Sequence, residues 1–169
     1  YTGAGFRGLP VVDSPEALAA EGFVVAIGDN RVRADRFTHY LSAGLSPVSV
    51  VHPSAIVAKD ATIGDGTVIF AGVVVNSDAA IGGNAILNTG ATVDHDCVIG
   101  AHAHIAPRCA LAGNVSVGEG ALLGIGTVVV PGRRIGDWAT CGAGAVVIAD
   151  IPDGVTAAGV PARQLRGRE

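Results

Sequence analysis

Three histidines and two aspartates lie within one short stretch of the chain, residues 93–104. His95 lies between Asp94 and Asp96, and His102 and His104 follow in the same stretch. An imidazole that titrates near neutral pH can take a proton from an amine or hydroxyl as it attacks a thioester. An adjacent carboxylate raises the basicity of that imidazole and fixes its tautomer. The stretch therefore contains candidates for a general base and its supporting acid in acyl transfer.

The elements that must position these side chains follow a six-residue repeat. An aliphatic residue occupies every sixth position from Val57 to Val147, with Cys141 as the exception, and a small residue lies two positions earlier in most repeats. Glycines add a period of eighteen residues: Gly64, Gly82, Gly100, Gly118 and Gly136. The two periods together predict a solenoid whose coils have three short sides, with parallel strands of successive coils about 4.8 Å apart. The series spans five such coils.

The repeat resembles the hexapeptide-repeat acyltransferases over residues 51 to about 163. This resemblance implies a left-handed parallel β-helix, a homotrimer and a mainly β chain, with the handedness taken from the family because spacing does not supply it. We expect a partial Rossmann-like α/β segment at 1–50, the β-helix acyltransferase domain at 51–151, and a C-terminal cap and tail at 152–169.

The first fifty residues fall outside the repeat. Residues 23–28 are predicted to form a buried strand, and Asp29 with Asn30 offers an N-cap for a helix from about 31 to 43. Residues 14–18 indicate the start of another short helix. The larger side chains of the longer helix follow helical spacing, namely Val32, Arg36, Phe37, Tyr40 and Leu41.

Three segments in order, 8–12, 26–30 and 52–55, resemble the sialic-acid O-acetyltransferase and bacillosamine or perosamine N-acetyltransferase group. The N-terminal Rossmann-like half of that group binds a nucleotide-sugar, which implies acceptor contacts at Gly28, Asp29 and Asn30. The group's glycine-rich first loop and acidic pair are not in this sequence, which starts downstream of both. Truncation and genuine absence both remain open.

The same resemblance assigns the candidate catalytic residues. Asp94-His95-Asp96 is similar to the family's active-site histidine motif, which implies that His95 is the general base and that Asp96 supports it. His104 matches a position that contacts acetyl-CoA. His102 has no matching role and is expected at a solvated corner. Gly113 lies one coil above His95 and should leave space beside the base.

Ile125 and Ala143 match further positions that contact acetyl-CoA. In the eighteen-residue register Gly124 stacks on Gly142, and Gly126 stacks on Gly144, so a strip of bare backbone flanks both residues. The strip either admits an extended pantetheine arm or eases the turns of the coil. The segment that ends in Pro161, Ala162 and Arg163 resembles the one that closes these helices near the adenine of CoA, so Pro161 and Arg163 are further candidates.

The register also predicts where the site assembles. His95 follows Val93 at a corner, whereas His104 lies beyond the next corner, on another side of the triangle. Two side chains placed in this way within one subunit cannot act on one thioester. If both act, they come from neighbouring subunits of the trimer.

Composition excludes several classes of function. A formal net charge of -4 gives no general affinity for nucleic acid, and no apolar run approaches the roughly 20 residues of a membrane-spanning helix. The first residues carry no secretion signal, so the protein is expected to be cytoplasmic. Three cysteines without a CxxC pair suggest buried thiols rather than disulfides or zinc.

The preferred function is acetyl-CoA-dependent N-acetylation of an amino group on a nucleotide-linked sugar, without a metal. O-acetylation of sialic acid or another surface-polysaccharide sugar is the alternative, because a catalytic histidine serves amines and hydroxyls alike. Two readings from other classes are a γ-carbonic-anhydrase-like zinc enzyme, which needs three converging histidines, and a non-catalytic trimeric scaffold.

Overall fold

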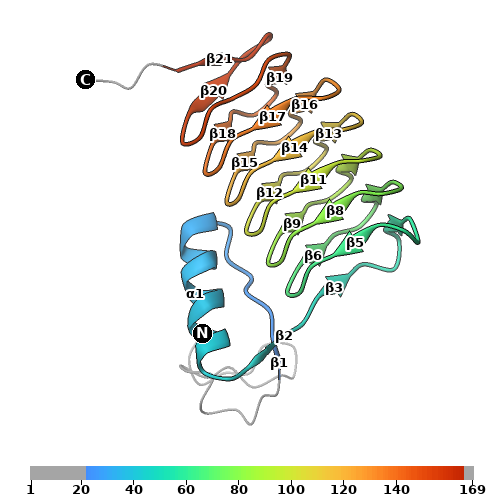
Figure 1. Cartoon of the computed structure of the whole chain (residues 1–169), viewed down its shortest axis with the longest axis vertical. Coiled ribbons are helices and arrows are strands. Elements are labelled where there is room, and N and C mark those ends of the chain that lie inside the picture. The colour runs from blue at the N-terminus through green and yellow to red at the C-terminus, as the bar shows by residue number, and fades with distance from the viewer. Residues whose placement is uncertain (1–21, 166–169) are drawn as a thin grey trace.

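The computed structural model describes residues 22–165. Its main body is a three-sided parallel β-helix of about six coils, with a small α/β unit packed against one side (Figure 1). The series 57–147 spans five of these coils, and strands before and after it extend the stack. Residues 14–18, where a short helix was predicted, lie outside the described residues.

Each side of the β-helix is one sheet of short, almost entirely parallel strands. The eight-stranded face contains β3 (Val50–Val51), β6 (Val68–Ile69), β9 (Ile86–Leu87), β12 (His104–Ile105), β15 (Leu122–Leu123), β18 (Thr140–Cys141), β20 (Thr156–Ala158) and β21 (Arg163–Gln164). The six-stranded face contains β4 (Ile56–Val57), β7 (Val74–Val75), β10 (Thr92–Val93), β13 (Ala110–Leu111), β16 (Val128–Val129) and β19 (Val146–Val147). The five-stranded face contains β5 (Thr62–Ile63), β8 (Ala80–Ile81), β11 (Val98–Ile99), β14 (Ser116–Val117) and β17 (Arg134–Ile135).

The eighteen-residue register is the pairing register of the strands. Thr92 pairs with Val74 below and Ala110 above, and the same step relates the paired strands from β3 to β19. Within each of these strands the second residue points into the prism and the first points outward. The aliphatic series and the small residues before it form one continuous core along the axis.

We name the three edges of the prism for what they hold. The His95 corner joins the six-stranded face to the five-stranded face, and the α1 corner joins the five-stranded face to the eight-stranded face. The glycine corner joins the eight-stranded face to the six-stranded face and includes Gly126 and Gly144. Many corner residues have positive φ, a conformation that favours Gly, Asn and Asp.

The α/β unit consists of β1 (Gly22–Phe23), α1 (Asn30–Ser42) and β2 (Ser46–Pro47), with β1 and β2 parallel. The predicted helix and its Asp29 cap are confirmed, since the Asp29 carboxylate accepts a hydrogen bond from the Val32 amide at 2.9 Å. The predicted strand 23–28 is wrong beyond Phe23. Residues 24–28 have no strand partner among residues 22–165, where β1 pairs with β2 and β2 is two residues long.

The predicted face of α1 is also wrong in part. Val32 and Leu41 are exposed, and the buried residues are Asn30, Arg33 and Phe37. Arg33 is fully buried and donates hydrogen bonds to the carbonyls of Ile27, Asn84 and His102. Burial lowers the pKa of Arg33 to about 10. This stripe fixes α1 along the α1 corner.

Candidate active site

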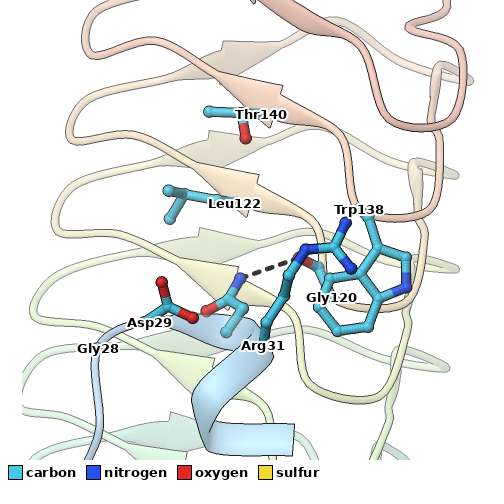
Figure 2. A pocket seen from close by; sticks show the side chains of 8 residues that line it. Gly28, Asp29, Arg31, Gly120, Leu122, Trp138 and Thr140 are labelled. Carbon is cyan, nitrogen blue, oxygen red and sulfur yellow. Dashed lines mark hydrogen bonds between the residues drawn. The ribbon is translucent and has the colours of Figure 1, made fainter.

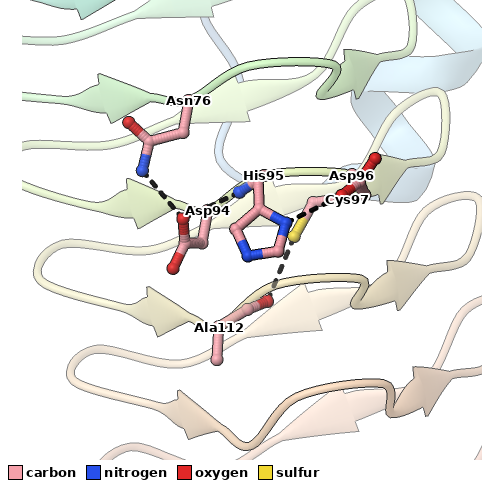
Figure 3. A network of polar contacts seen from close by, with 6 residues as sticks. All are labelled: Asn76, Asp94, His95, Asp96, Cys97 and Ala112. Carbon is pink, nitrogen blue, oxygen red and sulfur yellow. Dashed lines mark hydrogen bonds and ion pairs between the residues drawn. The ribbon is translucent and has the colours of Figure 1, made fainter.

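The His95 corner holds a short polar network that spans three successive coils, from Asn76 to the Ala112 carbonyl, which accepts from Cys97 (Figure 3). His95 Nδ1 lies 2.7 Å from an Asp96 carboxylate oxygen. Asp94 accepts a hydrogen bond from the His95 backbone amide at 2.8 Å and another from the Asn76 side chain, in the preceding coil, at 2.9 Å. The two aspartates therefore have different tasks: Asp96 orients the ring, and Asp94 fixes the backbone that carries it.

The contact with Asp96 leaves His95 Nε2 available as the proton acceptor, provided that the Nδ1 proton faces the carboxylate. The Asp96 carboxylate, helped by the charge of Asp94, raises the pKa of His95 above its ordinary value. The hydrogen bond from Asn76 is the main reason that the pKa of Asp94 lies below its usual range. The His95 side chain is 60% exposed in the single chain, so a substrate or another subunit can reach it.

Gly113 lies against the His95 ring, as the register predicted. A Cβ atom at position 113 would lie 2.5 Å from both Cε1 and Nε2 of His95. Such a distance is well inside van der Waals contact, so only glycine lets the ring occupy this place. The glycine thus sets the position of the nitrogen that would accept the proton.

His104 has a different environment. It lies on β12, on the outward side of the eight-stranded face, in a mostly apolar cavity of about 220 Å³. We call this the His104 cavity. Its walls come from residues 25–28, from β6 and β9, and from Phe70 and Asn88.

His104 Nε2 contacts the Asn88 side-chain amide at 3.2 Å, while Nδ1 is buried without a hydrogen-bond partner among the described residues. Burial, and then the nearby positive charge of Arg33, lowers the pKa of His104 to about 4. The ring is therefore neutral at physiological pH. It can give or accept a hydrogen bond there but cannot serve as a strong base.

The glycine corner is open where the sequence predicted a strip of bare backbone. Added Cβ atoms at Gly126 and Gly144 would meet nothing within 4 Å. Ile125, which lies between Gly124 and Gly126 in the chain, is 60% exposed. Gly124 and Gly142 must be glycine because there is no space for a side chain. A Cβ at Gly124 would collide with the backbone of the next coil, and a Cβ at Gly142 would collide with Ala158. Gly126 and Gly144 also have φ values of 70° and 69° at the turn, so both explanations apply to this open pair.

Ala143 is exposed at the same corner, and the Gly144 amide donates to the Ile125 carbonyl at 2.8 Å. Residues 159–162 close over the last coil: Val146 donates to the Gly159 carbonyl and accepts from the Ala162 amide. Pro161 and Arg163 are exposed beside this closure. These candidates thus gather near one end of the glycine corner.

Gly28, Asp29 and Asn30 lie away from the His95 corner, at the start of α1. Together with Arg31, Gly120, Leu122, Trp138 and Thr140 they line a second cavity of about 180 Å³, the Trp138 cavity (Figure 2). Gly28 lines both cavities.

The prediction of a solvated corner for His102 is wrong. Its Nδ1 lies 2.8 Å from the Asn84 amide nitrogen, and its ring packs edge-on against Phe37 at 5.8 Å between centroids. Burial lowers its pKa. His102 therefore helps to anchor α1, an arrangement that depends on contacts remote in sequence.

Apart from Gly28, Asp29 and Asn30 at the start of α1, the candidates lie in two groups on different edges. His95, Asp96 and Gly113 form one group, whereas Ile125 and Ala143 flank the face that carries His104. Asn76, Asn88, Arg31 and Trp138 were not predicted as site residues from the sequence. The eighteen-residue register could have identified Asn76, which lies eighteen positions before Asp94.

Within residues 22–165, no three His, Cys, Asp or Glu side chains are grouped so that they could hold a metal ion. Over the same range, no helix has the length and apolar character needed to cross a membrane. Cys97, Cys109 and Cys141 are free and buried.

A three-sided hexapeptide-repeat β-helix with a carboxylate-supported histidine at one edge and an open glycine edge defines the class of hexapeptide-repeat acyltransferases. No family model matches the chain. The chain is similar to PerB from Caulobacter crescentus, whose structure was solved in complex with CoA and GDP-perosamine. The two are 46% identical and superpose with a TM-score of 0.91, and the match covers 95% of this chain and 80% of PerB. The acetyltransferase domain of PglB from Neisseria gonorrhoeae, in complex with acetyl coenzyme A, is 38% identical, with a TM-score of 0.92 and coverages of 98% and 83%.

Among curated proteins, UDP-N-acetylbacillosamine N-acetyltransferase of Bacillus subtilis is 49% identical over 50 residues, which is 29% of this chain and 23% of that relative. The chain belongs to the family of hexapeptide-repeat sugar N-acetyltransferases that includes the perosamine and bacillosamine enzymes. The expected left-handed parallel β-helix is confirmed.

Proposed function

We propose that this protein transfers the acetyl group of acetyl-CoA to the amino group of a nucleotide-linked 4-amino sugar. The observation that carries the proposal is the His95 ring, held by Asp96 and seated on Gly113. The relatives reported above add support, because one was solved with CoA and GDP-perosamine and another with acetyl coenzyme A.

In this proposal His95 acts as the general base. Its Nε2 takes a proton from the amine as the amine nitrogen forms a bond to the thioester carbonyl carbon. The protonated ring then returns that proton to the departing CoA sulfur, so His95 ends each cycle neutral. Asp96 stabilises the protonated ring and keeps Nδ1 as the donor.

His104 and Asn88 would serve the same reaction without exchanging a proton. Both are neutral hydrogen-bonding groups in a largely apolar cavity, where such bonds are stronger than in water. The unpartnered Nδ1 of His104 is suited to a polar group of acetyl-CoA or of the acceptor. Ile125, Ala143, Gly126 and Gly144 offer an open wall for the pantetheine arm.

We further propose that the protein is a homotrimer built on the six-stranded face. The outward side chains of that face are mostly apolar: Ile56, Val74, Thr92, Ala110, Val128 and Val146. The same face runs from the glycine corner to the His95 corner. In a ring with this face toward the threefold axis, the His95 corner of one subunit meets the glycine corner of the next. Each site would then combine two subunits.

A cytoplasmic location belongs to this proposal, because acetyl-CoA and nucleotide sugars are cytoplasmic metabolites and the three buried cysteines are unpaired.

The proposed N-acetylation is tested by measuring CoA release with a panel of acceptors. Nucleotide-linked 4-amino sugars should support turnover, whereas free sialic acids and 4-hydroxy analogues should not. Turnover with the hydroxyl acceptors alone would refute N-acetylation.

A further inference from the structure

Asn76 and Asp94 occupy the same place in two successive coils, eighteen positions apart at the His95 corner. Asn76 follows β7, and Asp94 follows β10, which pairs with β7. The side-chain nitrogen of Asn76 donates a hydrogen bond to Asp94 Oδ1 at 2.9 Å (Figure 3). The strand register therefore places the carboxamide directly beside the carboxylate.

Asp94 Oδ1 receives a second hydrogen bond, from the His95 backbone amide at 2.8 Å. One oxygen thus connects the preceding coil to the residue that carries the ring. The hydrogen bond from Asn76 is also the largest reason that the pKa of Asp94 is lowered, so it favours the ionised acceptor. Without Asn76, the Asp94 side chain could turn to another rotamer and release the His95 amide.

The His95 amide depends on a side chain, whereas the backbone groups beside it do not. The His95 carbonyl accepts from the Asn114 amide at 2.9 Å, and the Asp96 amide donates to the Ser77 carbonyl at 3.1 Å. Both are backbone hydrogen bonds between successive coils. The His95 amide has no backbone acceptor within residues 22–165, and Asp94 Oδ1 takes that place. The position of the turn that carries His95 is therefore set in part by side chains.

The repeat does not require a polar pair at this place. The equivalent positions of the other coils hold Ala58, Ala112, Val130 and Ile148. Polar side chains occur here only in the coil of His95 and in the coil before it. The pair thus serves the turn that carries His95 rather than the strand ladder.

We propose that Asn76 is a positioning residue of the acetyl transfer, which acts through Asp94 to hold the His95 backbone, and with it the ring, in place. The inference rests on the proposed function, in which His95 is the general base. Asp96 contacts the ring itself, so it cannot replace a hold on the backbone. A displaced base slows the chemical step, whereas substrate binding by other parts of the site is unaffected.

Asn76→Ala should fold, because alanine occupies the equivalent positions 58 and 112. Its kcat should fall about tenfold, less than the roughly 10²-fold cost of a shift of about 1 Å, because Asp94 keeps part of its hold on the amide. The KM values for both substrates should stay within about twofold of wild type. Ser77→Ala is the matched control and should keep its kcat, because Ser77 is exposed at the same corner and its hydroxyl makes no hydrogen bond to the described residues.

An exchange of the two side chains tests the pair itself. Asn76→Asp removes the donor and sets two carboxylates against each other, so kcat should fall at least as far as in Asn76→Ala. The second change, Asp94→Asn, restores an amide–carboxylate pair with the roles exchanged, and its carboxamide oxygen can still accept from the His95 amide. The double variant should recover most of the kcat that Asn76→Asp loses.

Hydrogen exchange of the His95 amide, followed by NMR in the full chain, tests the same hold without any turnover. The exchange rate should rise about tenfold in Asn76→Ala and return toward the wild-type rate in the double variant. Unchanged exchange or unchanged kcat in Asn76→Ala, an equal loss in Ser77→Ala, or no recovery in the double variant would overturn the inference. A wild-type chain that acetylates no amino sugar would instead refute the proposed function and leave the hold on His95 to stand on the exchange rates.

Discussion

The His95 corner and the His104 cavity each contain a histidine, nine positions apart within one coil, and the two histidines have opposite surroundings. His95 is exposed beside a carboxylate, and its pKa is raised. His104 is largely covered by residues 25–28 beside a neutral amide, and its pKa is lowered to about 4. One imidazole is thus prepared to take a proton, and the other to remain neutral.

The difference arises from where each residue lies on the triangle. A corner residue of a β-helix projects toward solvent or a neighbouring subunit, so carboxylates can gather around it. A residue on a face can be covered by a segment from outside the repeat, as Arg33 holds residues 25–28 over His104 through the Ile27 carbonyl. The position within the coil therefore decides which histidine is suited to act as a base.

Of the substitutions that test this difference between the two histidines, removal of the proposed base should have the largest effect on turnover. His95→Ala should lower kcat about 10³-fold, within the range for loss of a positioned general base. Steady-state CoA release provides the measurement, and an unchanged oligomeric mass by light scattering provides the control. Unchanged turnover would mean that the proton acceptor lies elsewhere.

The second-largest loss of turnover is expected when the His95 ring is displaced but not removed. Gly113→Ala places a methyl group within 2.5 Å of the ring and should cost about 10²-fold in kcat, since a shift of about 1 Å in a catalytic group has that effect. The same change made in His95→Ala should have almost no further effect. A second full loss in the double variant would show that Gly113 acts independently of the ring.

Loss of the neutral histidine should be milder and should leave the pH dependence in place. His104→Ala should lower kcat/KM about 30-fold, the worth of one hydrogen bond in a buried site. Profiles from pH 5 to 9 should keep their acid limb, because the pKa of His104, about 4, lies below that range. A moved acid limb would indicate that His104 titrates in the reaction.

The smallest effect is expected from Asp96→Asn, about tenfold in kcat/KM, since the carboxylate tunes the base rather than reacting. Asp96 raises the pKa of His95, and activity is lost as falling pH protonates His95. The variant's acid limb should therefore move to lower pH. A limb at the wild-type position, or a loss as large as that of His95→Ala, would contradict this role.

The repeat made most of the fold and half of the site predictable. Strict periodicity reports local alternation and stacking, so the three faces, the contact between His95 and Asp96, and the seat on Gly113 follow from positions one or eighteen apart. The strand ladder needs no information beyond this period.

Contacts between the α/β unit and the β-helix were not predictable in the same way. The buried face of α1 carries Arg33 and Asn30 instead of the apolar Val32 and Leu41, because its partners are backbone carbonyls at the α1 corner. Hydrophobic spacing cannot indicate such a polar interface. For the same reason the anchoring role of His102 and the cover over His104 were missed.

In the proposed trimer each site joins the His95 corner of one subunit to the His104 cavity of the next. Mixed refolding of His95→Ala with His104→Ala tests it most directly, because a ring of both variants creates interfaces at which each partner supplies its intact half. For random mixing in equal amounts we predict recovery of about a quarter of wild-type turnover, far above either variant alone. Activity that stays at the average of the two separate variants would contradict a shared site.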